Sequence, residues 1–135
     1  MKILVKLGKS KNILATIAIG DEYYQSWLKN ASPSWKKYCI QHDLGLVVFD
    51  KDLISDKDKF WKKATWQKML IAETLRNSSL SVNNVCYLDT DILINHQLAP
   101  NIFNNFNKKK ISLVSCVKNL PYSRNFMELQ KLLSF

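Results

Sequence analysis

Arginine is scarce in this chain, although the chain is basic. Of its 20 Lys and Arg residues, only two are arginines, Arg76 and Arg124, and the formal net charge is +9. Arginine is the residue that proteins prefer for bidentate contacts with phosphates and nucleobases. A lysine excess with so little arginine does not indicate a specific nucleic-acid partner, and we expect none. The positive charge instead favours an anionic small ligand or an acidic membrane face.

Cysteines are few and far apart, and long apolar runs are missing. Cys39, Cys86 and Cys116 do not have the spacing of a metal site, so we expect free thiols in a reducing compartment. No stretch reaches the run of about 18 apolar residues that a membrane span needs. Lys residues interrupt the apolar residues of the segment 1–7, and its apolar stretch is too short for a signal peptide. We expect a cytoplasmic protein, and any association with a membrane should be peripheral, at the membrane surface.

Short apolar runs and helical stretches alternate along the chain. With 135 residues, 47% of them hydrophobic, the chain is long enough for one domain (residues 1–135) with a buried core. Run lengths and flanking turn residues predict strands at 13–19, 46–49, 85–88 and 111–117, and helices at 22–30, 32–42, 60–76 and 127–135. This alternation predicts an α/β fold with a mainly parallel sheet.

Polar residues follow three of the predicted strands. Gly20 and Asp21 follow the first, Asp50 follows the second, and the triplet 89–91 (Asp-Thr-Asp) follows the third. In open α/β sheets, ligands bind beyond the carboxyl ends of the strands. We therefore expect these three strand ends to form one binding site.

The triplet at residues 89–91 is the most informative of the three. Apolar residues precede Asp89 and resume directly after Asp91, at residues 92–94. A buried carboxylate is costly unless it is paired or binds a cation, and a hard cation such as Mg²⁺ or Mn²⁺ prefers carboxylate oxygens. Such a cation commonly holds a diphosphate. The alternative is that the two Asp residues cap an ordinary turn, which is the common role of an isolated Asp-x-Asp.

Lys68 stands on the apolar face of the helix predicted for residues 60–76. Trp61, Ala64, Ile71 and Leu75 recur at the three-to-four spacing of one helix face, and Lys68 falls on the same face. An ammonium group in this position needs a partner, and a phosphate would serve. The alternative is that the side chain snorkels to the edge of the helix. Both interpretations remain open at this stage.

Together these residues resemble the nucleotide-sugar-binding half of GT-A glycosyltransferases. The likeness is greatest to retaining enzymes of the glycogenin type and of the fungal α-galactosyltransferase and plant xylosyltransferase type, and it covers residues 13–103. Four stretches carry it: 16–23 (Thr-Ile-Ala-Ile-Gly-Asp-Glu-Tyr), similar to the first strand and turn; 34–42, similar to a helix that ends in Tyr38 and His42; 66–68 (Trp-Gln-Lys); and 87–94, which matches the Asp-x-Asp signature.

The resemblance implies a Rossmann-like sheet and transfer of a sugar from a UDP-sugar donor to a hydroxyl of a glycan, lipid or protein acceptor. It implies that Asp91 binds Mn²⁺ or Mg²⁺ directly and that Asp89 contacts the metal or the ribose. It names no catalytic base. The residues that it implies for donor binding are Ile17, Ala18, Ile19, Gly20, Tyr23, Lys68, Asp89 and Thr90.

The chain also departs from this family. A complete GT-A domain is longer, and its second half supplies the acceptor pocket and usually a His that ligates the metal. Neither His42 nor His96 stands where that ligand would be. We therefore expect a truncated, donor-binding half that lacks the acceptor half or self-associates through the apolar residues 127–135.

Two other functions fit parts of the sequence. A phosphatase of the haloacid dehalogenase type also places Asp-x-Asp after an apolar strand. That motif usually lies near the N-terminus and carries Thr or Val two residues after the second Asp, where this chain has Leu93. The non-enzymatic alternative is a basic module that binds nucleotides or polyanions without catalysis.

Overall fold

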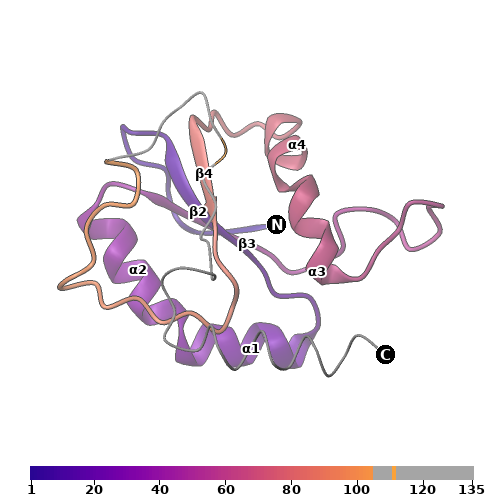
Figure 1. The fold of residues 1–135 in the computed structure, drawn as a ribbon, viewed down its shortest axis with the longest axis horizontal. Helices are drawn as coiled ribbons and strands as arrows, with labels where there is room; N and C mark the ends of the chain where they lie inside the picture. The colour runs from indigo at the N-terminus through magenta and orange to yellow at the C-terminus, as the bar shows by residue number, and fades with distance from the viewer. Residues whose placement is uncertain (105–110, 112–135) are drawn as a thin grey trace, which may run out of the picture. The chain divides into compact units, whose positions relative to one another are not determined.

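A four-stranded sheet forms the centre of the computed structural model, which describes residues 1–104 and residue 111 (Figure 1). The strand order is β1-β3-β2-β4, where the strands span β1 Lys2–Val5, β2 Asn12–Ile17, β3 Gly45–Phe49 and β4 Asn84–Tyr87. The central strand β2 pairs in parallel with both β3 and β4, and β1 pairs antiparallel with β3. The expected α/β fold with a mostly parallel sheet is confirmed at this level.

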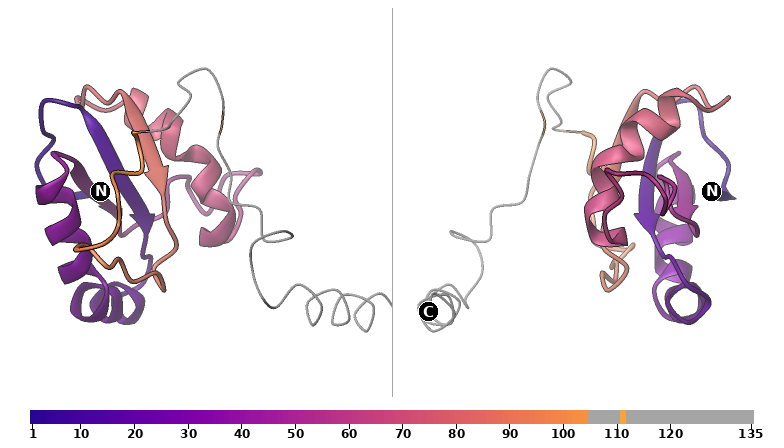
Figure 2. Two further views of the ribbon diagram at one scale, coloured as in Figure 1. Left: turned by 60° about the vertical axis from the view of Figure 1, so that its left-hand side comes forward. Right: turned by 90° about the vertical axis from the view of Figure 1, so that its right-hand side faces the viewer.

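Helices connect the parallel strands and cover both faces of the sheet. The connection from β2 to β3 contains α1 and α2, and the connection from β3 to β4 contains α3, a 3₁₀ turn (η1) and α4. Their bounds are α1 Asp21–Asn30, α2 Ser32–Gln41, α3 Ala64–Gln67, η1 Lys68–Leu70 and α4 Ile71–Arg76. The left view of Figure 2 shows α1 and α2 on one side of the sheet and α3 and α4 on the other. The chain thus moves outward from β2 to β3 and returns past β2 to β4, so the strand order reverses beside β2.

The side chains of β2 and β3 point alternately into two apolar clusters. Because helices cover both faces, both strands are apolar almost throughout, as is typical of parallel strands. One cluster joins the sheet to α1 and α2 and contains Leu14, Leu46, Val48, Trp27, Trp35, Tyr38 and Cys39. The other joins the sheet to α4 and contains Ile13, Ala15, Ile17, Val47, Phe49, Ile71 and Leu75.

The helix predicted for residues 60–76 is shorter than expected and interrupted. It begins at Ala64, and η1 separates α3 from α4. Before it, Asp58 closes a turn: its carboxylate accepts the Phe60 N–H at 2.8 Å and its carbonyl accepts the Trp61 N–H at 2.9 Å. These bonds hold Trp61 outside the helix, so the prediction that it extends the apolar helix face is wrong.

The N-terminal strand β1 was not expected from the sequence. Its charged residue Lys2 suits an edge strand, because edge strands carry charges that discourage pairing with other chains. Lys2 lies opposite Val48, and its ammonium group is 3.0 Å from Asp50. The predicted elements at 111–117 and 127–135 lie outside the described residues, apart from Ile111, which is exposed.

The cysteines in the described part of the chain are free thiols. Cys39 is buried in α2 and Cys86 is partly buried in β4. Burial raises the pKa of Cys39 to about 12 and that of Cys86 to about 11, so both thiols stay protonated. Within the same residues, none of the helices has the length and apolar character needed to cross a membrane.

After β4 the chain runs along α2 as an irregular return segment, residues 88–104. Side chains of α2 hold its backbone at several points. The indole N–H of Trp35 donates to the Ile92 carbonyl at 2.8 Å, and His42 Nε2 lies 3.1 Å from the Ala99 carbonyl oxygen. The Tyr38 hydroxyl donates to the Pro100 carbonyl at 2.8 Å and accepts the Ile102 N–H at 2.9 Å.

Tyr38→Phe should destabilise the protein, because it leaves the Pro100 carbonyl and the Ile102 N–H without their partner. We expect a loss of about 1–3 kcal/mol in the free energy of unfolding, measured by urea denaturation. Tyr23→Phe, at an exposed position of α1, is the matched control and should change stability by less than about 0.5 kcal/mol. Equal stability of the two variants would show that these bonds do not hold the return segment.

Candidate functional site

The carboxyl ends of β2 and β4 lie next to each other where the strand order reverses. Pairing continues past the last residue of β4, since the Leu88 N–H donates to the Ala15 carbonyl at 3.1 Å. The buried Thr16 hydroxyl donates to the Leu88 carbonyl at 2.7 Å. These bonds place the start of the 89–91 triplet beside residues 18–20, which follow β2. In open α/β sheets this is the edge where ligands bind.

Asp89 and Asp91 stand in an exposed turn that follows β4. The turn is closed by a hydrogen bond from the Ile92 N–H to the Asp89 carbonyl, 3.2 Å long. Both carboxylates are exposed, and so are Ile92 and Leu93. The expectation of buried carboxylates within an apolar run is therefore wrong: β4 ends at Tyr87, and the cost of burial does not require a cation here.

Tyr87 connects Asp89 to Lys68. Its hydroxyl donates to Asp89 Oδ1 at 2.8 Å, and the Lys68 ammonium lies over its ring, 5.5 Å from the ring centroid. Burial raises the pKa of Tyr87, and the hydrogen bond to Asp89 and the negative charges of Asp89 and Asp91 raise it further. The hydroxyl therefore remains a proton donor to the carboxylate at all ordinary pH values.

Lys68 is half-buried and its ammonium group contacts the face of an aromatic ring. A cation over such a ring is attracted by the ring's quadrupole. In the described part of the chain no acidic side chain forms a salt bridge with Lys68. Its positive charge is therefore not neutralised by a carboxylate in the described part of the chain, and it lies over the ring whose hydroxyl contacts Asp89.

The residues that follow β2 differ in what they can offer a ligand. Ile17 and Ala18 have buried side chains, and the Ala18 N–H donates to the Phe49 carbonyl at 2.9 Å. Ile19 is partly buried, whereas Gly20 and Tyr23 are exposed. Gly20 has φ 96°, a conformation that favours glycine and turns the chain from β2 into α1. An exposed backbone turn and one exposed aromatic ring are therefore the groups available here.

The N-terminus of α1 does not suit an anion. Asp21 and Glu22 occupy its first turn. Their charges stabilise the positive end of the helix dipole, but they would repel a phosphate. An anionic ligand at this rim therefore depends on positive charge from elsewhere, namely from Lys68 or from a bound cation.

Asp50 belongs to the sheet edge at β1 rather than to the site. Its carboxylate lies 3.0 Å from the ammonium of Lys2 and 3.3 Å from the N-terminal ammonium group. The hydrogen bond from Lys2 is the largest cause of a lowered pKa of Asp50. The expectation that all three strand ends join one site is therefore too broad, because β3 is separated from β4 by β2 and its terminal carboxylate is already paired.

Gln67 organises the loop before α3 and was not singled out from the sequence. It is fully buried; its Oε1 accepts the Leu53 N–H at 2.7 Å, and its Nε2 donates to Asp52 Oδ1 at 2.6 Å and to the Lys62 carbonyl at 2.8 Å. A buried glutamine inside an amphipathic helix was the available signal. Tyr38 and His42, which carried part of the family resemblance, instead hold the return segment.

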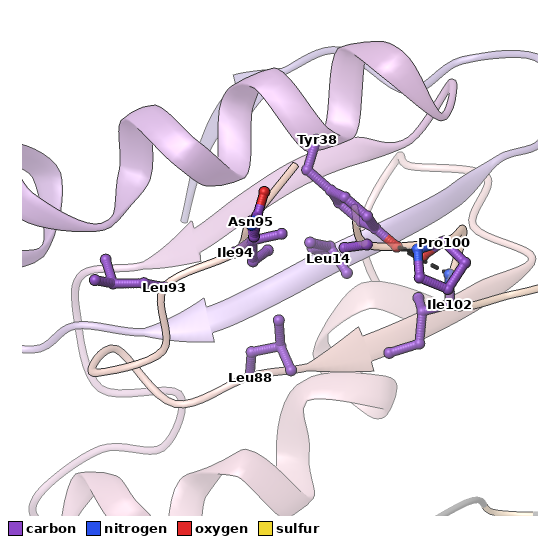
Figure 3. Close-up of a pocket in the computed structure, with 9 residues that line it drawn as sticks. Leu14, Tyr38, Leu88, Leu93, Ile94, Asn95, Pro100 and Ile102 are labelled. Carbon is purple, nitrogen blue, oxygen red and sulfur yellow. Dashed lines mark hydrogen bonds between the residues drawn. The ribbon is translucent and has the colours of Figure 1, made fainter. Parts of the chain in front are cut away.

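An apolar cavity of about 360 Å³ lies between β2, α2 and the return segment (Figure 3). Figure 3 shows Tyr38 reaching from α2 toward Pro100, so its hydroxyl is already hydrogen-bonded. The lining contains no charged group and consists of Leu14, Tyr38, Leu88, Leu93, Ile94, Asn95, Ala99, Pro100 and Ile102. The cavity adjoins the Asp89–Asp91 turn but suits an apolar group and not a diphosphate.

The described residues at this edge include two acidic side chains that could contact a cation, Asp89 and Asp91. Across residues 1–104, no cluster of three or more His, Cys, Asp or Glu side chains could hold a metal ion. Mg²⁺ typically binds through one or two carboxylates together with waters and substrate phosphates. A cation bound by Asp89 and Asp91 would therefore need waters or ligand phosphates to complete its coordination.

Comparisons with protein-family models, with curated proteins and with solved structures find no match for this chain.

Gln67→Met should loosen the loop before α3, because methionine fills the space but cannot bond Leu53 or Lys62. We expect a loss of about 1–3 kcal/mol in stability and faster tryptic cleavage between Lys57 and Lys63. Gln25→Met, on the exposed side of α1, is the control. Unchanged cleavage in Gln67→Met would mean that the loop is held by other contacts.

Proposed function

We propose that this chain binds a UDP-sugar together with Mn²⁺ or Mg²⁺, as the donor-binding part of a GT-A-type glycosyltransferase with a Rossmann-like sheet. The observation that carries the proposal is the position of Asp89 and Asp91. They follow the carboxyl end of β4, beside the end of β2, where the strand order reverses. A hydroxyl group of an acceptor would receive the sugar, and no described residue is assigned as its base.

The charges of the site suit a diphosphate shared between a cation and a lysine. When bound by Asp89 and Asp91, the cation would act as a Lewis acid for the leaving diphosphate. Lys68 would add a second positive charge, which stabilises developing negative charge most when it is held in place beforehand. Tyr87 holds both groups: its ring contacts Lys68 and its hydroxyl contacts Asp89.

The nucleoside would lie against the residues that follow β2. Gly20 exposes its backbone there and Tyr23 exposes its ring, so a base has one flat apolar surface to stack on. Ile17, Ala18 and Ile19 would contribute backbone and shape, and Thr90 lies in the turn between the two carboxylates. Asp21 and Glu22 at the start of α1 would keep the phosphates away from this end.

Metal-dependent binding of UDP separates this proposal from its two rivals. A dehalogenase-type phosphatase uses the first Asp as a nucleophile and has no need of UDP. A polyanion-binding module needs lysines but no divalent cation. Only the transferase proposal requires nucleotide and cation together, with both Asp89 and Asp91 contributing.

Asp91→Asn should weaken UDP binding in the presence of Mn²⁺, because it removes a charged ligand and keeps the shape of the side chain. We expect at least a tenfold loss of affinity by calorimetry, in line with a lost charge-assisted contact. Removing Mn²⁺ with EDTA should weaken the unmodified chain as much. Asp56→Asn, in the exposed loop after β3, is the control. Equal UDP binding with and without Mn²⁺ would rule the metal role out.

Tyr87→Phe and Lys68→Met should separate the two halves of the site. Tyr87→Phe keeps the ring under Lys68 but loses the hydrogen bond to Asp89, so Mn²⁺ affinity should fall by about tenfold, as is usual for groups that orient metal ligands.

Lys68→Met should leave Mn²⁺ affinity unchanged, weaken UDP binding, and keep or raise the melting temperature, since it removes a half-buried charge. If Lys68→Met leaves UDP affinity unchanged, Lys68 is not a donor contact.

A further inference from the structure

Large apolar side chains are unusually exposed just before and within α3 and η1. Phe60 is 69% exposed, Trp61 37%, Trp66 68% and Met69 78%. Exposed apolar groups that lie close together usually mark an interaction surface. We call these four residues, with Lys59, Lys62 and Lys63, the basic aromatic surface.

The structure holds the two parts of this surface together. Trp66 and Met69 are three residues apart and therefore face the same way on the helix. Between them, the buried Gln67 amide points inward and donates to the Lys62 carbonyl at 2.8 Å. That bond attaches the Phe60–Lys63 stretch to the turn of helix that carries Trp66 and Met69.

The charge around this surface is mainly positive, although the Asp58 carboxylate accepts the Phe60 N–H at 2.8 Å and the Asp52 carboxylate accepts from Gln67 at 2.6 Å. Residues 59–69 contain four Lys and no acidic residue. The Lys59 ammonium lies 4.8 Å from the centroid of the Phe60 ring, so charge and apolar surface are in direct contact. The exposed aliphatic residues of the return segment differ, because residues 91–102 contain no Lys or Arg and one acidic residue, Asp91. Nothing in that second group indicates what covers it.

We propose that the basic aromatic surface docks on an anionic phospholipid bilayer. Tryptophan and phenylalanine favour the membrane–water interface, and each lysine near an anionic leaflet strengthens binding. A nucleic acid would use the lysines and the rings, but Met69, the most exposed of the four apolar residues, would gain nothing from stacked bases. An acyl-chain boundary accommodates all four apolar side chains while the ammonium groups stay at the head groups.

This inference does not depend on the transferase proposal, although the two meet at one residue. Lys68 lies between Trp66 and Met69 in the sequence and contacts Tyr87, which bonds Asp89. Docking through Trp66 and Met69 would therefore bring the rim that carries Asp89 close to the lipid head groups.

The test uses the full chain with vesicles of phosphatidylcholine alone and of phosphatidylcholine mixed with phosphatidylglycerol. The four tryptophans give a site-specific readout, because Trp27 and Trp35 are buried in the core whereas Trp61 and Trp66 belong to the surface. We expect co-sedimentation with the anionic vesicles and a blue shift of the fluorescence, which reports Trp61 and Trp66 entering an apolar medium.

Two variants and two matched controls give the test its specificity. Lys62→Ser with Lys63→Ser should weaken binding by about 25-fold, at roughly fivefold for each lysine. Phe60→Ser with Met69→Ser should weaken it at least about tenfold and reduce the blue shift while keeping both reporter tryptophans. Lys29→Ser with Lys37→Ser, and Ile40→Ser with Leu98→Ser, remove the same kinds of exposed groups elsewhere and should bind as the unmodified chain does.

Several results would overturn the proposal. These are no binding to anionic vesicles, equal binding to the neutral vesicles, or equal loss in the surface variants and their controls. Binding of single-stranded RNA or heparin without vesicle binding would assign the surface to polyanions. Concentration-dependent light scattering that Phe60→Ser with Met69→Ser abolishes, without vesicle binding, would assign it to a second copy of the chain.

Discussion

Parallel pairing of β2 with a strand on each side is the constraint on which the rest of the structure depends. It buries β2 beyond its first residue between two layers of helix, and it brings residues 18–20 and the Asp89–Asp91 turn to the same edge. Thr16 contributes directly, because its buried hydroxyl bonds the Leu88 carbonyl at 2.7 Å. A valine in place of Thr16 would pack equally well but would leave that carbonyl without its partner. The position of the site is therefore a consequence of sheet order and not of the loops alone.

Tyr87 keeps two opposite charges apart at this edge. A direct ion pair between Lys68 and Asp89 would neutralise both groups and leave little for a ligand. The tyrosine instead offers its ring to the lysine and its hydroxyl to the carboxylate. Each charge is held in position, and each is still available to a partner of opposite sign. A cation bound to a phosphate group carries both signs, so this arrangement is compatible with the ligand that we propose.

Three of the four strands and the first two helices were predictable from the sequence because their signals are local. Apolar runs that end in turn residues predicted β2, β3 and β4, and Ser32 with Pro33 predicted the start of α2. The start of α3 was not predictable, because Lys63 provides no side-chain cap and the turn that excludes Trp61 is made by Asp58. Contacts between distant residues were also invisible, such as those of Gln67 with Leu53 and those of Tyr38 with the return segment. The exposure of Asp89 and Asp91 was likewise not predictable from the sequence, since apolar neighbours in sequence do not determine where a strand ends.

Four consecutive residues combine the tasks that the two proposals assign to this region. Trp66 and Met69 face outward, Gln67 points into the loop, and Lys68 lies over Tyr87. The change from α-helix to 3₁₀ turn falls within this stretch, at Lys68. A 3₁₀ turn has three residues per turn, so side chains three apart lie directly above one another. Lys68 is therefore aligned with Ile71, which is buried against the sheet, and its long side chain reaches the ring at the end of β4 instead of solvent. Trp66 and Met69, which the membrane proposal uses, and Lys68, which the transferase proposal uses, are thus carried by the same turn of backbone.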